Sequence, residues 1–433
     1  MKRETVKFQL NDRDVTALAG ETIWSVARRE GIEIAHLCHK PGLKPEGNCR
    51  ACMVEVEGER VLAASCCRNA TDGMKVQTHS ARATRARSLV LELLMSDAGQ
   101  TTDFLTKTSE LSYWAKKENA KLDRLPMREA RALQSEADAS HPAIHVDLDA
   151  CIQCTRCVRA CREEQNNDVI GLAFRGAESK IVFDADTLMG NSTCVACGEC
   201  VQACPTGALS PARGAGMAAI TKKVDSVCPF CGVGCQLTLN VSESNGAQKI
   251  EFVDGADGPA NHKRLCVKGR YGFDYVHSPE RLTRPLIRRE GVAKDVTHIE
   301  RVKRGELALS ELFREATWEE ALDFAASGLK KAHDAARSEK RLSAVAGFGS
   351  AKGSNEEAYL FQKLIRQGFD TNNVDHCTRL CHASSVAALL EGIGSGAVSN
   401  PVADVEHAEL IFLIGANPTS NHPVAATWIK NAV

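Results

Sequence analysis

The stretch Cys228-Pro229-Phe230-Cys231-Gly232-Val233-Gly234-Cys235 is followed, after a gap, by Leu265-Cys266-Val267-Lys268-Gly269-Arg270. Three cysteines share one tight loop and the fourth comes from elsewhere, an order in which proteins supply four thiolates to an iron–sulfur cluster. The glycines of the loop let the backbone wrap closely around a cubic cluster. We therefore expect a [4Fe–4S] site, called the proximal site below, at Cys228, Cys231, Cys235 and Cys266. A structural zinc site is the alternative reading.

The region upstream contains an internal repeat of cysteines. Its two copies have the spacing C-x2-C-x2-C-x3-C and begin at Cys151 and Cys194. In bacterial ferredoxins with this run, the fourth cysteine binds the other cluster. We expect cluster one to be held by Cys151, Cys154, Cys157 and Cys204. We expect cluster two to be held by Cys194, Cys197, Cys200 and Cys161. The crossed ligands would tie both copies into one small fold, and two zinc knuckles are the weaker alternative.

The first 80 residues predict a further unit. Residues 4–18 alternate apolar and polar side chains around Asn11-Asp12, which is typical of a hairpin, and Thr22 can cap a helix that ends near Gly31. The four thiolates of a [2Fe–2S] cluster would then come from Cys38, Cys49, Cys52 and Cys66. Cys67 is adjacent, and the sequence only weakly prefers Cys66 as the fourth ligand.

Composition favours a reducing compartment. The chain has 433 residues and 19 cysteines, which lie at ligand spacings and not as scattered disulfide pairs. The formal charge of −1 gives no electrostatic case for binding nucleic acid. The first ten residues lack the apolar core of a signal peptide, and no apolar run approaches the roughly 20 residues of a membrane span. We therefore expect a cytoplasmic protein.

Other segments predict helices and strands. Thr84–Met95 reads as a helix with its apolar stripe at Leu89, Val90, Leu93 and Leu94. Residues 96–140 read as a connector with charged helical segments at Lys116-Lys117-Glu118 and Arg128–Arg131. Further on, Leu342–Gly349 predicts a buried strand, Ser354 can cap a helix over Asn355–Gln367, and Glu409–Asn417 predicts a second apolar strand. This alternation indicates a parallel α/β sheet.

Two motifs carry a resemblance to a known family. The proximal quartet with Lys268 resembles the [4Fe–4S] site of the molybdopterin oxidoreductases, in which the lysine lies between cluster and pterin. The segment Asp375–His382 resembles the metal-ligand segment of the formate dehydrogenase branch of that family. The first 75 residues resemble the [2Fe–2S] domain of NADH-linked large subunits. Many such relatives carry a further cluster on one His and three Cys, but this chain has no Cys between Cys67 and Cys151 and no His between His79 and His141.

The resemblance implies roles for particular residues. Cys381 would be the protein ligand to molybdenum or tungsten, and His382 would stand beside the open face of the metal, to position formate or accept a proton. A buried cysteine with a satisfied histidine is the alternative, and Cys377 is expected to be small and buried. Two glycine turns would contact the guanine dinucleotide of a bis-pterin cofactor, through Ser350, Lys352, Gly353, Asn355, Gly415, Asn417 and His422. A packing role for His422 is equally open.

The sequence thus predicts a multidomain α+β protein. Its parts are a β-grasp [2Fe–2S] domain (1–80), a helical connector (81–140), a ferredoxin domain with two [4Fe–4S] clusters (141–215), the proximal [4Fe–4S] domain (216–280) and the start of an α/β molybdopterin-binding region (281–433). These assignments use 17 of the 19 cysteines. Because relatives continue through further pterin-binding domains, we expect these residues alone not to hold the whole cofactor.

The resemblance implies a formate dehydrogenase catalytic subunit that oxidises formate to carbon dioxide. Electrons would run through the proximal cluster, the ferredoxin pair and the [2Fe–2S] cluster to a partner that binds FMN and NAD. One alternative is an electron-transfer large subunit of the NADH–quinone oxidoreductase or hydrogenase type, and another is a nitrate reductase. The sequence leaves molybdenum versus tungsten and the direction of catalysis open.

Overall fold

The computed structural model describes residues 4–98, 109–121, 123–126, 137–212, 219–244, 246–341 and 343–433. These residues fall into two compact units, each described here by itself. The first unit comprises Met1–Phe273 and Pro401–Val433, and the second comprises Asp274–Asn400.

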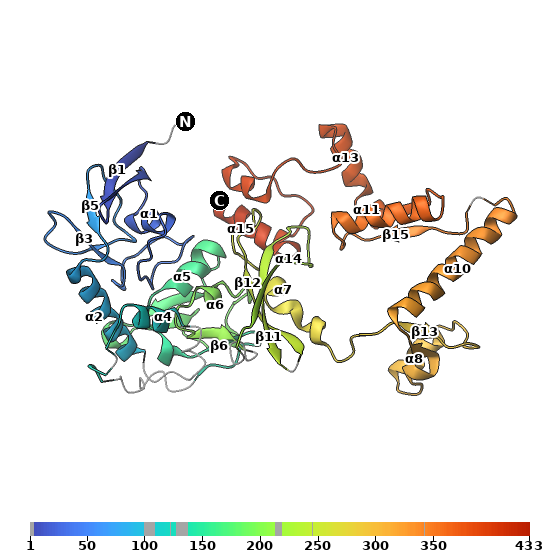
Figure 1. The fold of residues 1–433 in the computed structure, drawn as a ribbon, viewed down its shortest axis with the longest axis horizontal. Coiled ribbons are helices and arrows are strands. Elements are labelled where there is room, and N and C mark those ends of the chain that lie inside the picture. Colours follow the sequence, from blue (N-terminus) through green and yellow to red (C-terminus); the bar gives the residue numbers. More distant parts are fainter. Residues whose placement is uncertain are drawn as a thin grey trace. The chain divides into compact units, whose positions relative to one another are not determined.

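The first unit begins with a five-stranded sheet in the order β2-β1-β5-β3-β4 (Figure 1). Its strands are β1 (Thr5–Leu10), β2 (Arg13–Leu18), β3 (Met53–Val56), β4 (Ala63–Ala64) and β5 (Lys75–Gln77). The expected hairpin is confirmed, because β1 and β2 pair antiparallel about Asn11 and Asp12, which both have positive φ. Helix α1 (Ile23–Arg29) is capped by Thr22, as expected, and buries Ile23 and Val26 against the sheet.

Two helices follow the sheet and join it to the next domain. They are α2 (Ala81–Asp97) and α4 (Glu110–Lys117). The expected stripe of α2 was wrong, because Leu91 is fully buried whereas Leu93 is 58% exposed. The polar residue Arg87 takes a place on the buried face, where it donates to the carbonyls of Met53 and Thr78. The expected helical segment Arg128–Arg131 lies outside the described residues.

The ferredoxin domain is built from two short hairpin-like pairs and two short helices. Strands β6 (Ile144–Val146) and β9 (Leu209–Pro211) pair antiparallel, as do β7 (Ile170–Ala173) and β8 (Lys180–Phe183). Helix α5 (Arg156–Arg159) runs into the π-helical turn η2 (Ala160–Glu164), and α6 (Glu199–Ala203) follows the second cysteine run. Short 3-10 turns lie at η1 (Leu148–Ala150), η3 (Gly176–Glu178) and η4 (Met189–Asn191).

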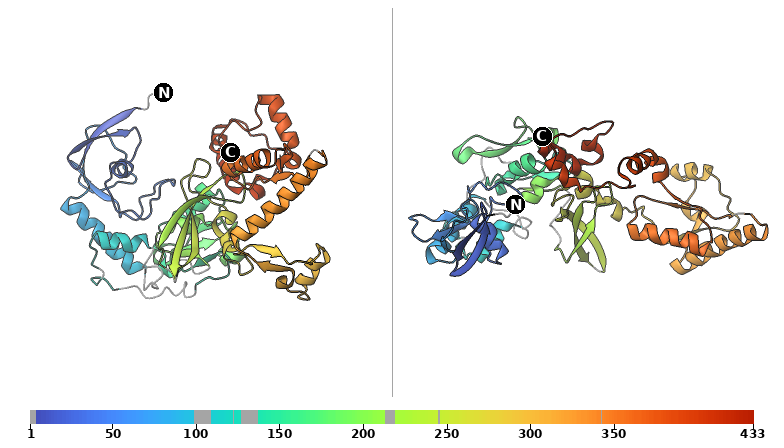
Figure 2. Two further views of the ribbon diagram at one scale, coloured as in Figure 1. Left: turned by 45° about the vertical axis from the view of Figure 1, so that its right-hand side comes forward. Right: turned by 90° about the horizontal axis from the view of Figure 1, so that it is seen from above.

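The proximal domain is a three-stranded antiparallel sheet, green to yellow in Figure 2. Its strands are β10 (Lys222–Val227), β11 (Gln236–Ser244) and β12 (Ala247–Gly255), and helix α7 (Val267–Tyr271) leads into the turn η5 (Gly272–His277). The C-terminal segment joins this domain through η7 (Val402–His407), α14 (Pro418–Asn421) and α15 (Pro423–Ala432). Val424 is buried in the same core as Cys228 and Cys235.

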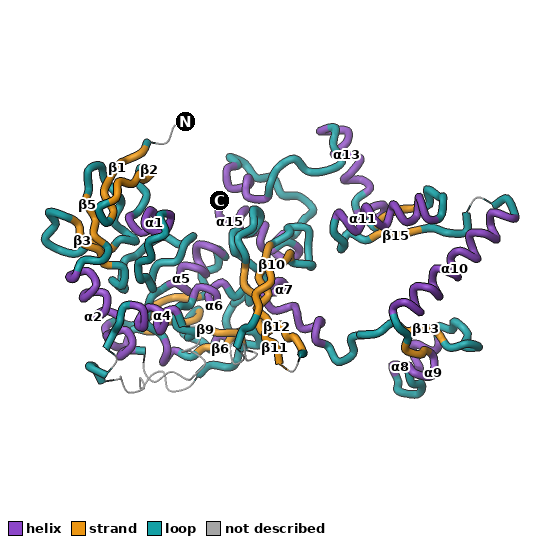
Figure 3. Tube along the Cα trace, in the orientation of Figure 1, coloured by secondary structure: helices purple, strands orange, loops and turns teal. Residues whose placement is uncertain are grey.

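The second unit is mostly helical, with two two-stranded sheets (Figure 3). One sheet pairs β13 (Leu286–Arg288) with β14 (Phe313–Glu315) antiparallel, and the other pairs β15 (Gly347–Gly349) with β16 (Val374–His376) parallel. The helices are α8 (Thr297–Lys303), α9 (Leu309–Leu312), α10 (Trp318–Ser338), α11 (Asn355–Lys363), α12 (Thr378–Cys381) and α13 (Ala383–Ile393), with the π-helical turn η6 (Leu364–Gly368) after α11.

Two strand predictions need correction. In the segment 342–349 only Gly347–Gly349 is a strand, Phe348 is exposed, and Leu342 lies outside the described residues. The segment Glu409–Asn417 forms no strand, and Leu410, Phe412 and Ile414 are exposed. A strand needs a neighbour for its backbone hydrogen bonds, and neither segment finds a full sheet among the described residues. The cap of Ser354 on α11 is confirmed. No described helix combines the length and apolarity needed to cross a membrane.

Candidate iron–sulfur sites and metal segment

The first candidate site gathers the cysteines beside the β-strands of the N-terminal sheet. Cys38, Cys52 and Cys66 are buried, and Cys49 is half-buried. The Sγ atoms of Cys52 and Cys66 are 3.3 Å apart, and the Cys38 amide donates to Cys49 Sγ at 3.3 Å. Hydrogen bonds from Cys49 and Cys66 lower the pKa of the Cys38 thiol, which favours the thiolate that a metal needs.

Cys67 differs from Cys66 in position. Its side chain is exposed, although its Sγ lies 3.6 Å from Cys66 Sγ. Gly47 has φ +66°, and a Cβ there would meet Cys67 Sγ at 2.8 Å. The loop therefore turns its buried side toward Cys66 and leaves Cys67 at its outer edge.

The four cysteines expected around cluster one line one cavity, together with apolar residues. They are Cys151, Cys154, Cys157 and Cys204. The four expected around cluster two also lie together, since the charges of Cys161, Cys194 and Cys197 all act on the Cys200 thiol. Burial raises the pKa of Cys157 and of Cys200, because each thiolate would lose its hydration without a counter-charge. Bound iron would supply that counter-charge.

The two cysteine runs fold alike. Gln153 and Ala196, two residues after the first cysteine of each run, both have positive φ. Their amides therefore point back and donate to Cys151 Sγ at 3.4 Å and to Cys194 Sγ at 3.3 Å. Hydrogen bonds to ligand sulfurs are one of the factors that set the potential of an iron–sulfur cluster.

The proximal cavity is lined by its four cysteines and by residues of α7 and α15. The lining includes Cys228, Cys231, Cys235, Cys266, Lys268, Gly269, Pro423 and Val424. A Cβ on Gly269 would meet Cys228 Sγ at 3.3 Å, so the helix approaches the sulfur closely only because this residue is glycine. Lys268 Nζ donates to the Ser420 carbonyl at 3.3 Å.

The donor sets suit clusters better than single ions. Among the described residues, no three His, Cys, Asp or Glu side chains are grouped as a mononuclear metal site requires. The cysteines of two quartets instead surround cavities, as the wider spacing of thiolates around an iron–sulfur cluster demands. Four soft sulfur donors in an apolar lining fit such a cluster.

In the second unit, two strand ends bring two predicted segments together. Strands β15 and β16 are parallel, with Gly349 opposite His376, so the turn after Gly349 lies beside the segment that follows His376. The Ala351 amide donates to Cys377 Sγ at 3.3 Å across this edge. Ser350 and Gly353 line a cavity there, with Glu357 and Asp375. Asn355 is the first residue of α11, and Lys352 lies in the turn, where its amide donates to Ser350 Oγ.

Cys381 is the last residue of α12, and its side chain is exposed. Its Sγ lies 3.3 Å from Nε2 of His382, the residue between α12 and α13. Asp375 and Arg379 form an ion pair of 2.9 Å that bridges the start of the segment to α12. The prediction of a buried Cys377 was wrong, because Cys377 is exposed at the open strand edge.

The second glycine turn belongs to the first unit. Gly415 has φ +62°, and the Asn417 side chain caps α14 by accepting from the Ser420 amide at 3.4 Å. His422 lies between α14 and α15. Sequence reasoning placed both glycine turns on one cofactor, but they occur in different units and each is described only by itself.

Sequence reasoning missed four buried charged residues between the cysteine sites. They are Arg156, Arg159, Glu199 and Arg270, and each is at most 4% exposed. All four lie within or beside the cysteine motifs. Their partners are far away in the sequence, so no local pattern could have identified them.

Comparisons with known proteins cover the same segments. Residues 3–81 match the 2Fe-2S iron-sulfur cluster binding domain, and residues 141–210 match the ferredoxin-like domain of NADH-quinone oxidoreductase subunit 3. Residues 221–278 match the molybdopterin oxidoreductase Fe4S4 domain, and residues 281–433 match the molybdopterin oxidoreductase family.

Similar curated proteins carry several names. The chain is 29% identical to the "Putative formate dehydrogenase YrhE" of Bacillus subtilis, over 100% of this chain and 46% of that protein. It is 31% identical to an NADH-quinone oxidoreductase subunit of Rhizobium meliloti, over 99% and 46%. It is 31% identical to "NADPH-Fe(3+) oxidoreductase subunit alpha" of Geobacter sulfurreducens, over 95% and 45%. The chain thus spans less than half the length of each of these relatives.

A solved structure, the NAD+-reducing [NiFe]-hydrogenase in its H2-reduced state, is also similar. The identity is 29%, over 49% of this chain and 90% of that chain, with a TM-score of 0.45.

Proposed function

The chain combines iron–sulfur domains with a molybdopterin oxidoreductase domain and belongs to that family, and from this premise we propose that it acts as a formate dehydrogenase catalytic subunit. The observation that carries the proposal is the Cys381–His382 pair, 3.3 Å from Sγ to Nε2, which follows a parallel strand edge with a glycine turn beside it. The relatives named as formate dehydrogenases support it.

Each residue of the proposed site would have its own task. A bound molybdenum or tungsten centre supplies a two-electron acceptor for formate. Cys381 would ligate the metal as a thiolate, a soft donor for a metal that dithiolenes already bind. His382 would hold formate or take up the proton as the C–H bond breaks. The turn at Ser350, Lys352, Gly353 and Asn355 would bind cofactor phosphates through backbone N–H groups, as would the turn at Gly415, Asn417 and His422.

The cysteine quartets would hold one [2Fe–2S] and three [4Fe–4S] clusters. The ligands proposed are the 16 cysteines at 38, 49, 52, 66, 151, 154, 157, 161, 194, 197, 200, 204, 228, 231, 235 and 266. Their geometry supports this, because two quartets line cavities and the members of the other two lie close enough to influence one another's thiols. Lys268 would lie between the proximal cluster and the pterin. A flavin- and NAD-binding partner would receive the electrons.

The test uses the assembled enzyme that contains this chain. Cys381→Ala should reduce formate-dependent NAD+ reduction to background, and His382→Asn should lower kcat by about 10²–10⁴-fold, the usual contribution of a general acid–base group. The matched control is Cys67→Ala, an exposed thiol outside the proposed site. Elemental analysis of each preparation would show whether molybdenum or tungsten is bound. Full formate oxidation by Cys381→Ala would contradict the proposal.

A second candidate is favoured by the match to an NADH-quinone oxidoreductase subunit at 31% identity. In that case the chain would only carry electrons, and Cys381→Ala would leave NADH-dependent electron flow unchanged while wild type shows no activity with formate. A nitrate assay of the same preparation tests the remaining alternative.

A further inference from the structure

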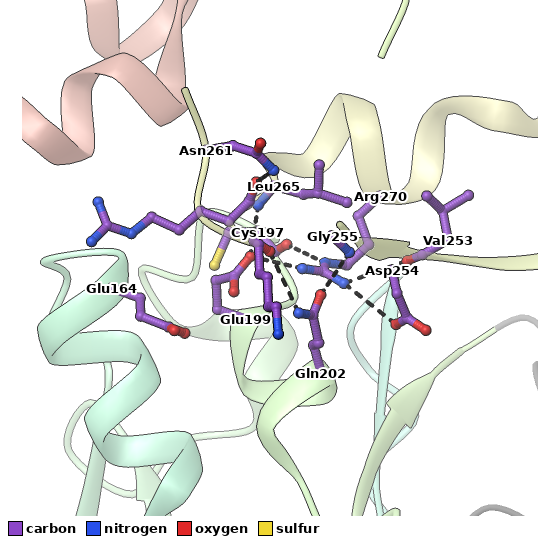
Figure 4. A network of polar contacts seen from close by, with 12 residues as sticks. Glu164, Cys197, Glu199, Gln202, Val253, Asp254, Gly255, Asn261, Leu265 and Arg270 are labelled. Atoms are coloured by element: carbon purple, nitrogen blue, oxygen red, sulfur yellow. Dashed lines mark hydrogen bonds and ion pairs between the residues drawn. The ribbon is translucent and has the colours of Figure 1, made fainter. Parts of the chain in front are cut away.

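Arg270 forms a buried ion pair with Glu199 between the ferredoxin and proximal domains (Figure 4). The pair measures 2.7 Å from Arg270 Nη2 to Glu199 Oε1, and the two residues are 3% and 1% exposed. Taking two charges out of water costs several kcal/mol for each ion, so such a pair persists only when further hydrogen bonds hold it. The same two side chains make those bonds to the backbone on both sides.

These backbone bonds reach the neighbourhood of two different cysteine sites. Arg270 Nε donates to the Cys197 carbonyl at 2.8 Å, and Cys197 is a proposed ligand of cluster two. Glu199 Oε1 accepts from the Leu265 amide at 2.8 Å, and Leu265 precedes Cys266 of the proximal site. A short path of hydrogen bonds therefore joins the two ligand loops through this one ion pair.

The local backbone is shaped for this contact. Gly198 has φ +74°, and a Cβ there would come within 2.1 Å of Arg270 Cδ. The guanidinium can reach the Cys197 carbonyl only because that side chain is absent. Glu199 Oε2 is buried and has no hydrogen-bond partner in the described structure, so the carboxylate is held by a single oxygen.

A second buried arginine occupies the equivalent place one step along the chain of sites. Arg159 of α5 donates through Nη2 to the carbonyl of Cys38 and also to that of Cys154 at 3.2 Å. Cys38 is a proposed [2Fe–2S] ligand, and Cys154 is a proposed ligand of cluster one. One guanidinium thus touches the ligand loops of two successive sites, and it is 4% exposed.

We infer that Arg159 and Arg270 are positioning residues for electron transfer, each fixing the ligand loops of two successive clusters and tuning the reduction potentials of both. This inference rests on the ligand assignments of the proposed function. The step itself is the move of one electron from a reduced cluster to the next oxidised one, and no bond forms or breaks. Each arginine shortens the path by hydrogen bonds and places a positive charge beside two clusters.

The charges predict the sign of each change. Reduction adds negative charge to a cluster, and net charge and hydrogen bonding help to set its potential. Arg270→Gln would leave the Glu199 carboxylate buried without its partner, and should therefore lower the potentials of cluster two and the proximal cluster. Glu199→Gln would leave the guanidinium unpaired and should raise both. Arg159→Gln should lower the potentials of the [2Fe–2S] cluster and cluster one only.

The experiment is a redox titration of the assembled enzyme under dithionite, followed by EPR, with pulsed EPR to measure magnetic coupling between neighbouring clusters. Each arginine variant serves as the control for the other, because each should shift only its own two clusters and weaken only their coupling. Arg29→Gln is the exposed control, since Arg29 pairs with Glu21 at the surface and should shift nothing. Arg270→Lys keeps the charge and should restore the potentials more than the coupling.

Several results would overturn the inference. Unchanged potentials and coupling in iron-replete Arg270→Gln and Arg159→Gln would do so, as would shifts of the same sign in Arg270→Gln and Glu199→Gln. If Arg270→Gln loses iron, the isosteric Glu199→Gln decides, because an absent upward shift there contradicts the inference. Missing cluster signals in wild type would instead sink the ligand assignments. Wild type with four clusters but no formate activity would sink only the formate proposal.

Discussion

At the scale of single residues, local spacing and distant contacts carry different information. The four cysteine quartets could be predicted because the ligands of one cluster mostly lie within a few residues of each other. The arginines between the sites could not, because Arg159 meets Cys38 and Arg270 meets Cys197 only once the domains have folded together. The burial of Cys377 was also mispredicted, because exposure depends on the open edge of β16 and not on residue type.

The adjacent thiols Cys66 and Cys67 offer a matched pair. Cys66→Ser should abolish or strongly distort the EPR signal of the [2Fe–2S] cluster, because Cys66 is buried with its sulfur 3.3 Å from that of Cys52. Cys67→Ser should leave the signal unchanged, because the Cys67 side chain is exposed. EPR of the dithionite-reduced proteins measures both. The reverse result would move the fourth ligand to Cys67.

At the scale of elements, the helices were easier to predict than the strands. Caps such as Thr22 and Ser354 act within one turn, so the sequence reveals them directly. The face that a helix buries depends on its neighbour, and α2 turns Leu91 toward α4 where the sequence suggested Leu93. Strand 409–417 failed for the same reason, since its apolar residues have no sheet to join among the described residues.

The corrected face of α2 makes a prediction about stability. Leu91→Ala should lower the free energy of unfolding by about 2–5 kcal/mol, because it removes a fully buried side chain and leaves a cavity. Leu93→Ala, the same change two residues on and at a site that is 58% exposed, should cost far less. Denaturant titration of both variants checks this. Equal losses would restore the stripe expected from the sequence.

At the scale of the whole molecule, the C-terminal segment completes the first unit. Trp428 Nε1 donates to the Ala260 carbonyl at 2.9 Å, and the Arg264 guanidinium lies 4.1 Å from the ring centroid of Trp428. Asn166 Nδ2 of the ferredoxin domain donates to the Lys430 carbonyl at 2.8 Å. The order of domains could be predicted from the motifs, but this return of residues 401–433 to the first unit could not, because it rests on contacts between segments far apart in the sequence.

The return of α15 also protects the proximal cavity, because Val424 lines it. Trp428→Ala should cost about 3–5 kcal/mol of stability, the usual range for a buried tryptophan. It should also speed the loss of the proximal cluster in air, since α15 would cover the cavity less firmly. Trp318→Ala, at a tryptophan that is 70% exposed, is the control. EPR after timed exposure to air follows the loss, and equal rates in both variants would contradict this role for α15.

The central claim is that cysteine quartets hold a series of redox clusters in this one chain. The direct measurement is the iron, zinc and acid-labile sulfide content of protein purified without oxygen, normalised to the polypeptide. We predict about 14 iron atoms per chain, from one two-iron and three four-iron clusters, with little zinc. Stoichiometric zinc in place of iron, or protein free of labile sulfide after anaerobic reconstitution, would contradict the account.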